Sequence, residues 1–150
     1  MNIRHHIIGL LLGVCLVSLG SCDIETSDNG TLDGYWHLIK VDTLSTGGSC
    51  EKAEALIFWS FQMRLMNVVD HVNDPDHFGY FLRFEYENNV LHLYNPYQNM
   101  RKDGDIKVED PTVLAPFGIN SLEENFYMEV LNDDEMVVNN NVLRLTFEKY

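Results

Sequence analysis

Positive charge is scarce in this sequence, which has 10 Lys and Arg residues against 23 Asp and Glu residues and a formal net charge of −13. Nucleic-acid-binding proteins neutralise phosphates with clustered Lys and Arg side chains, and peripheral proteins dock on anionic lipid through basic patches. This balance of charges favours neither surface. We therefore predict that nucleic acid is not a partner.

Cysteine is also scarce. Cys15 lies in the N-terminal apolar run and Cys22 comes shortly after it, so only Cys50 remains for the folded domain. A disulfide within that domain is excluded. Cys50 follows a Gly-Gly-Ser segment, which is typical of a loop. Either an exposed thiol or a partly buried, unreactive cysteine fits this context, and we expect the second.

Recognisable catalytic motifs are missing: the sequence has no G-x-S-x-G, no H-E-x-x-H and no phosphate-binding glycine loop. Carboxylates are available at Glu85, Glu87, Glu123 and Glu124. Glycoside hydrolysis, however, needs two carboxylates held at a set distance around a cleft, and nothing in the sequence indicates such a pair. We predict that the protein is not an enzyme and has no cofactor.

The segment DHVNDPDH has several side chains that can bind metals, namely His71, Asn73, Asp74, Asp76 and His77. Two imidazoles with carboxylates could hold zinc, and the oxygens alone could hold calcium. The spacing matches no closed set of ligands, and Asn-Asp-Pro-Asp is ordinary turn composition. We interpret the segment as a solvated loop and predict no metal site.

The N-terminus is a short polar segment with Arg4, followed by an almost purely apolar run from Ile7 to Leu19. A helix that spans a membrane needs about 20 apolar residues, so this run is typical of a secretory signal peptide. The run ends in Leu19-Gly20-Ser21-Cys22, which resembles the lipobox of bacterial lipoproteins. The resemblance implies cleavage before Cys22 and a lipid, such as palmitate and diacylglycerol, on that cysteine. An ordinary signal peptide is the alternative.

The segment after Cys22 is acidic and has no periodic apolar residues. We predict a signal peptide over residues 1–21, a flexible acidic tether over 22–31 and one folded domain over 32–150. The tether resembles the export signals of surface lipoproteins in gut-dwelling Gram-negative anaerobes, whereas Asp23 resembles an inner-membrane retention signal of enteric bacteria. We expect lipid anchoring to the outer membrane and leave the leaflet open.

Alternating apolar and polar residues dominate from residue 31 onward, which indicates β-strands. Residues 57–65 alternate as one long strand, with Met63 and Leu65 on its apolar face. Residues 80–87 and 90–93 flank Asn88-Asn89, which predicts a hairpin that pairs Glu87 with Val90 and Phe84 with Leu93. Further strands are expected over residues 34–41, 106–108, 126–131, 136–138 and 143–147, and a helical turn within 111–122.

Short connections between these strands favour an antiparallel meander, whose two edges must be hidden. We predict an all-β fold: a single meander β-barrel of seven to eight strands with a short helical turn near residues 111–122. A two-sheet sandwich is the alternative.

Gly34-Tyr35-Trp36 at the start of the first predicted strand resembles the lipocalin signature. The opening LDGYWHLIKVDTL and the closing VLRLTFEKY resemble small lipocalin-like lipoproteins of gut anaerobes, a family of unknown function. The resemblance implies that an arginine of the last strand, here Arg144, packs over Trp36 and closes one end of the barrel. A guanidinium on an indole ring is stabilised by a cation–π interaction.

Large apolar side chains are predicted on the inner faces of these strands. They either form the core or line a cavity, open beneath the 43–53 loop, for a small hydrophobic ligand. The candidate cavity residues are Trp59, Phe61, Met63, Leu82, Phe84, Phe126 and Met128. A second hypothesis is a protein-interaction module of an envelope assembly, whose acidic surface docks a partner protein.

Overall fold

The computed structural model describes residues 27–74, 78–100 and 103–150. The predictions for the signal peptide and Cys22, and for Asp76 and His77 in the 70–77 segment, lie outside the described residues. Within the described part of the chain, no helix is both long and apolar enough to cross a membrane.

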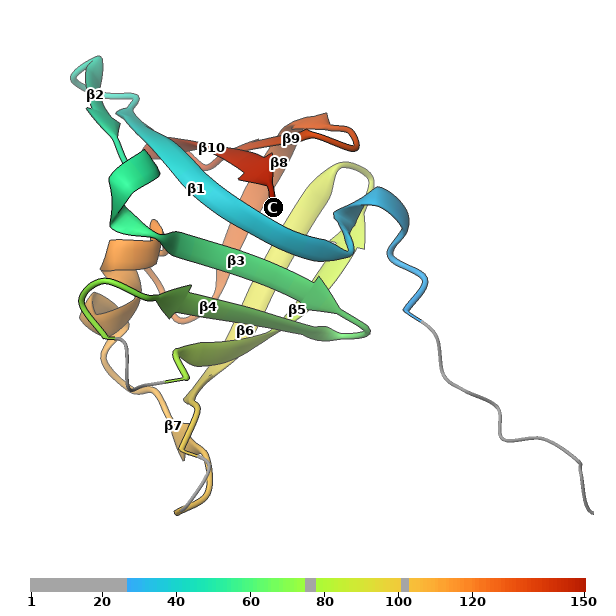
Figure 1. Ribbon diagram of the computed structural model, residues 1–150, viewed down its shortest axis with the longest axis vertical. Helices are drawn as coiled ribbons and strands as arrows, with labels where there is room; N and C mark the ends of the chain where they lie inside the picture. Colours follow the sequence, from blue (N-terminus) through green and yellow to red (C-terminus); the bar gives the residue numbers. More distant parts are fainter. Residues whose placement is uncertain (1–26, 75–77, 101–102) are drawn as a thin grey trace, which may run out of the picture.

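Eight strands form a closed antiparallel barrel (Figure 1). Each strand pairs with the next along the chain, and the last pairs with the first, which removes the free sheet edges among these eight strands. The predicted all-β meander barrel is therefore confirmed, and the sandwich is not formed. The strands are β1 (Gly34–Thr43), β3 (Ile57–Gln62), β4 (Leu65–Asp70), β5 (Tyr80–Glu87), β6 (Val90–Gln98), β8 (Glu124–Leu131), β9 (Glu135–Asn139) and β10 (Leu143–Lys149).

Two shorter strands lie outside this closed set. β7 (Ile106–Lys107) pairs with β6, and β2 (Gly48–Glu51) pairs with the end of β1. The segment predicted as a loop therefore contains a strand. Because β2 has only one neighbour and all four of its residues are exposed, Cys50 is an exposed thiol, and our expectation of a partly buried cysteine was wrong.

The β5–β6 hairpin has the predicted register, with Glu87 opposite Val90 and Phe84 opposite Leu93. Asn88 and Asn89 both have positive φ angles, 52° and 61°. This backbone conformation matches the right-handed twist of the two strands, and asparagine tolerates it better than most residues.

The single long strand predicted over residues 57–65 is two strands, β3 and β4, joined by a tight turn at Met63 and Arg64. Met63 has a φ of 55° and Leu65 begins the returning strand, so neither side chain points into the barrel. Both are exposed, at 41% and 40% of their surface. The prediction was wrong because apolar and polar residues keep alternating through this turn, and neither Met63 nor Arg64 is a residue type that marks a turn.

One end of the barrel is closed by η3 (Pro111–Phe117), a 3-10 helix seen at the left in Figure 1. The N-cap residue Asp110 accepts a hydrogen bond from the Thr112 N–H through its carboxylate. The C-cap residue is Gly118, whose φ is 83°. Leu114, Phe117 and Ile119 are part of the hydrophobic core. The predicted helical turn is thus confirmed, and it fills the mouth of the barrel.

The described N-terminal segment lies at the opposite end of the barrel (Figure 1). There, η1 (Gly30–Leu32) places Leu32 in the core, and the Trp36 indole N–H donates to the Leu32 carbonyl oxygen at 2.9 Å. A third 3-10 turn, η2 (Ala53–Ala55), connects β2 to β3. The two ends of the barrel are therefore closed by different segments.

Candidate functional site

The cation over Trp36 is Lys149, whose Nζ lies 4.8 Å from the ring centroid. The same Nζ donates to the Thr31 carbonyl oxygen at 2.9 Å. Trp36 and Lys149 are directly paired across β1 and β10. The closing pair at this end is therefore Trp36 with Lys149.

The prediction that Arg144 covers Trp36 was wrong. Arg144 lies opposite Asp42, near the other end of β1, and its Nε is 2.8 Å from a Glu129 carboxylate oxygen. Successive side chains of a strand point to opposite faces, so Arg144 faces outward while Leu145 and Phe147 face the core. Lys149 shares the inward face with those two residues, which is the signal that could have identified it.

Five of the predicted cavity residues are buried in the core: Trp59, Phe61, Leu82, Phe84 and Phe126. Their rings pack on one another, with centroid distances of 5.6 Å for Trp59 and Phe126 and 5.1 Å for Phe61 and Phe84. Met128 is partly buried against this core. Met63 is the exception, because it lies in the exposed β3–β4 turn.

The mouth of the barrel is closed over this core by a direct hydrogen bond. The Trp59 indole N–H donates to the Phe117 carbonyl oxygen of η3 at 3.1 Å. Between η3, the β1–β2 hairpin and β10, a hollow of about 400 Å³ remains. Val41, Cys50, Pro116 and Leu143 contribute to its walls.

A larger hollow of about 600 Å³ lies on the outer face of β3, β4 and β5, and we call it the β4 groove. Ser60, Asn67 and Phe81 form one row across these three strands and alternate with the inward-facing core residues. The polar lining residues are Ser60, Gln62, Asn67, His71 and Asn99. Leu65, Val69, Phe78 and Phe81 are among its apolar lining residues.

One wall of the β4 groove includes the ring of Tyr35, which belongs to a stack of aromatic rings. Tyr35 stacks on Phe58 with ring centroids 4.8 Å apart, and Phe58 stacks in turn on His37 at 4.7 Å. The Tyr35 hydroxyl lies 3.1 Å from His71 Nε2. Burial, and to a smaller extent the charge of Tyr150, raises the pKa of Tyr35, so this wall carries a neutral phenol at ordinary pH.

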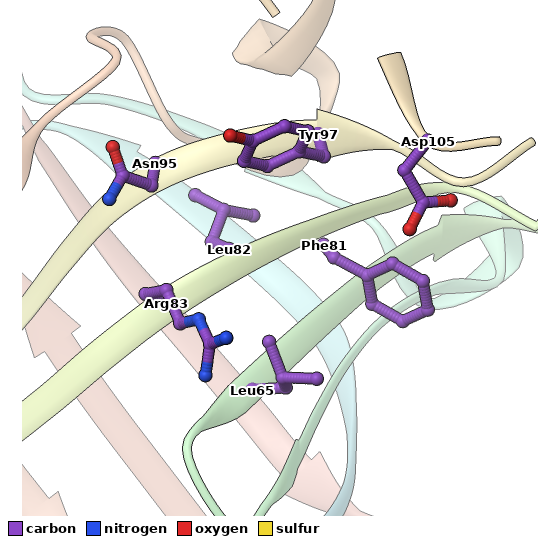
Figure 2. Close-up of a pocket in the computed structure, with 7 residues that line it drawn as sticks. All are labelled: Leu65, Phe81, Leu82, Arg83, Asn95, Tyr97 and Asp105. Atoms are coloured by element: carbon purple, nitrogen blue, oxygen red, sulfur yellow. The ribbon is translucent and has the colours of Figure 1, made fainter. Parts of the chain in front are cut away.

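A second outer hollow, of about 480 Å³, adjoins the β4 groove because Leu65 and Phe81 line both. Figure 2 shows its side chains, which come from β4, β5, β6 and the segment just before β7. Its remaining lining residues are Leu82, Arg83, Asn95, Tyr97 and Asp105. The two hollows are thus neighbours on the outside of the barrel.

The sequence patterns did not identify this surface. On β5, Arg83, Glu85 and Glu87 face outward, and Phe81 shares that face. A large aromatic residue on an otherwise polar face was the available signal. The sequence offered no comparable signal for Asn67, because β4 was not predicted as a strand.

The segment considered for metal binding forms a hydrogen-bonded turn in its described part. The Asp70 carboxylate accepts bonds from the backbone N–H groups of Val72 and Asn73 and from the Asn73 side chain. Burial acts to raise the pKa of Asp70, but these bonds outweigh it and the pKa is lowered. Across residues 27–74, 78–100 and 103–150, no group of three or more His, Cys, Asp or Glu side chains could hold a metal ion.

The family follows from a direct comparison. A model of the lipocalin-like domain matches residues 15–150. The chain belongs to this family. No curated protein matches the chain.

Two solved structures are similar to this lipocalin-like barrel. A lipocalin-like protein from Bacteroides uniformis is 17% identical, with a TM-score of 0.61 over 81% of this chain and 100% of the other. An uncharacterized protein from Bacteroides eggerthii is 16% identical, with a TM-score of 0.57 over 79% of this chain and 99% of the other. At such identities the likeness shows the shared fold.

Proposed function

We propose that this lipocalin-like chain is a lipid-anchored, non-catalytic binding protein of the cell envelope that holds its partner on the outside of the barrel. The observation that carries the proposal is the position of the β4 groove and the adjoining hollow on the outer face. The inner face offers less, because the rings expected to line a cavity pack on one another beneath η3.

A lipid anchor on Cys22 would lie near the β3–β4 turn, because the segment before β1 contacts that turn. The Met63 N–H donates to Ser27 Oγ at 2.7 Å, and the Asn29 side chain donates to the Met63 carbonyl oxygen at 2.9 Å. Cys22 precedes Ser27 by five residues, and five extended residues reach at most about 18 Å. A lipid on Cys22 would keep the β3–β4 turn, and with it one end of the β4 groove, close to the membrane.

Lipid attachment is tested by metabolic labelling with radioactive palmitate, followed by separation of membrane and soluble fractions. The wild-type chain should be labelled and sediment with the outer membrane, whereas Cys22→Ala should lose the label and leave the membrane fraction. Cys50→Ala is the matched control, because that thiol lies on exposed β2 and should leave labelling unchanged. A label that persists in Cys22→Ala would contradict lipidation at this residue.

Binding on the outer face is tested with the photoreactive residue p-benzoylphenylalanine, placed at Gln62 in the groove or at Tyr127 on β8. Tyr127 is a matched control because it is 59% exposed and lines neither hollow. Illumination of cells should give a discrete cross-linked product from position 62 only. Equal products from both positions, or none from either, would count against this function. A protein partner held through the acidic surface would add salt sensitivity to the cross-link.

The hollow at the barrel mouth supports a second candidate, a small hydrophobic ligand. Its volume of about 400 Å³ lies within the range of about 300–1,000 Å³ typical of small-molecule sites. Trp59 lies directly beneath η3 and should report any ligand that moves this segment. Fatty acids, bile acids and haem would be titrated against tryptophan fluorescence, and a flat response to all three would remove this candidate.

A further inference from the structure

We propose that the β4 groove is a binding site for an uncharged, hydroxyl-rich ligand, chemically a sugar chain. This inference rests on the proposed outer-face function and names the class of ligand. It is carried by three properties of the groove: the absence of Asp, Glu, Lys and Arg from its described lining residues, weakly engaged polar side chains, and apolar walls.

The β4 groove differs in composition from the rest of this acidic protein. Asp, Glu, Lys and Arg make up 22% of the sequence and give it a net charge of −13, yet none of these four residue types occurs among the described residues that line the groove. A site for an ionic ligand presents the opposite charge, since charge complementarity determines specificity. The ligand that suits this groove is therefore uncharged.

The side chains of Ser60, Asn67 and Asn99 in the groove are weakly engaged by the protein, whereas His71 is paired with the Tyr35 hydroxyl. Ser60 Oγ makes a long contact of 3.5 Å to the Asn67 carbonyl oxygen, and the Asn99 side chain donates to the Phe78 carbonyl oxygen at 3.4 Å. The Asn67 side-chain oxygen is covered by its neighbours and has no hydrogen-bond partner among the described residues.

An unpaired buried polar atom is costly, by about 1–3 kcal/mol in general. The terminal torsion of asparagine has a broad range, so a small rotation can turn the Asn67 amide toward a ligand. A ligand hydroxyl can both donate and accept, which matches amide groups of either orientation.

The walls of the groove supply the apolar half of the match. Phe81 of β5 and the stacked ring of Tyr35 of β1 lie on opposite sides of β4, with Leu65 and Val69 between them. A sugar ring has a face of C–H groups and a rim of hydroxyls. Apolar walls with a few placed polar groups are the usual composition of a small-ligand site, and here they fit both parts of the ring.

An extended peptide is the main competing ligand, and the sheet disfavours it. Peptides commonly bind by adding a strand to an open sheet edge, where backbone groups are unpaired. β4 lies in the middle of the sheet and is paired with β3 on one side and β5 on the other. The groove therefore offers side chains rather than a free backbone edge.

The adjoining hollow extends the site beyond a single ring. Leu65 and Phe81 line both hollows, so a chain that lies along the groove can continue past Phe81 into the hollow that Figure 2 shows. Beyond Phe81 it meets the Asn95 amide and the opposite charges of Arg83 and Asp105, beside the ring of Tyr97. We expect the affinity to rise with the number of sugar units.

The test uses the membrane-extracted full chain in detergent, with calorimetry to measure affinity and methyl NMR to locate binding at Leu65 and Val69. The probes are uncharged hexasaccharides of glucose, xylose, mannose and N-acetylglucosamine. An anionic heparin hexasaccharide and an uncharged hexapeptide serve as comparisons. At least one neutral hexasaccharide should bind with a Kd below about 1 mM, which corresponds to about −4 kcal/mol.

Variants localise the site. Phe81→Ala and Gln62→Ala should each raise the Kd about tenfold or more, a loss of about 1.4 kcal/mol. Gln62 is exposed, so its truncation spares the core, whereas Tyr127→Ala removes an exposed ring outside the groove and should change the Kd less than about twofold. An unchanged Kd in both groove variants would overturn the assignment.

The inference also fails if none of the four hexasaccharides shifts the Leu65 and Val69 methyl signals at about 10 mM, well above the Kd expected for the weakest specific complex. It fails equally if the peptide or heparin binds the groove in their place. Discrete cross-links from Gln62 without sugar binding would leave the outer-face function standing and remove only the ligand class. Absence of both the site-specific cross-link and sugar binding would remove both.

Discussion

Replacement of Phe117 by alanine should open the mouth of the barrel. The Phe117 side chain is 5% exposed, and its ring packs edge-on against Tyr80 with centroids 5.8 Å apart. Truncation of a buried phenylalanine to alanine costs about 3–5 kcal/mol, because transfer energy is lost and a cavity remains. A domain of this size has a total stability of about 5–15 kcal/mol, so the expected loss is a large fraction of it.

Urea unfolding followed by tryptophan fluorescence measures this loss, and the melting temperature should fall by about 10–20 °C. Val113→Ala is the matched control, because Val113 lies in the same helix but is 38% exposed. Its truncation should change the free energy of unfolding by no more than about 0.5 kcal/mol. The two variants together separate closure of the mouth from a general effect on η3.

A loss below about 1 kcal/mol for Phe117→Ala would refute the reasoning, because a side chain that closes the mouth cannot be removed so cheaply. Equal losses in Phe117→Ala and Val113→Ala would refute it as well. Either result would mean that η3 does not fill the barrel end in solution.

Three further predictions concern single contacts. Gly118→Ala should lower the free energy of unfolding in urea by about 1–3 kcal/mol more than Gly104→Ala. Both glycines have a φ of 83°, but only at Gly118 would a Cβ meet Leu145, at 2.7 Å. Equal losses would contradict this close approach. Lys149→Met should destabilise the barrel by about 1–2 kcal/mol, because Lys149 covers Trp36. Arg144→Met should cost at most about 1 kcal/mol, because Arg144 makes a surface ion pair. The opposite order in chemical denaturation would argue for the Trp36–Arg144 pairing expected from the sequence. The pKa of Glu129 lies below its ordinary 4.5, because the hydrogen bonds from Arg144 and Asn139 outweigh the effect of burial. This carboxylate therefore stabilises the fold at neutral pH and loses that effect as the pH falls from about 4.5 through the lowered pKa. The stability difference between wild type and Glu129→Gln should therefore shrink between about pH 7 and pH 3, and a difference that grows on acidification would be inconsistent with it.

The β5–β6 hairpin shows which kind of information the sequence carries reliably. Alternation fixes the inward face of each strand, and Asn88-Asn89 fixes the turn, so the register follows from residues close together in the chain. The Met63-Arg64 turn has no such turn-forming residues. The alternation therefore predicted one continuous strand at the point where the chain reverses direction.

The candidate site was less accessible to this reasoning than the fold. The β4 groove depends on side chains from β1, β3, β4 and β5 that are brought into one row by strand pairing. β4 was not predicted as a strand, and on the predicted strands alternation indicated an outward face without showing where it is hollow. Which of these surfaces is hollow depends on the curvature of the closed sheet and on side-chain size, and neither follows from period-2 patterning.

The sequence by itself determined the all-β meander, the inward aromatic residues and the charge of the surface, because each depends on composition or on spacing along one strand. The tertiary structure decided which cation covers Trp36, that η3 fills the barrel mouth, and that the larger hollow lies outside the barrel. These outcomes depend on contacts between residues far apart in the chain. The register between the first and last strands, set only when the barrel closes, brings such residues together.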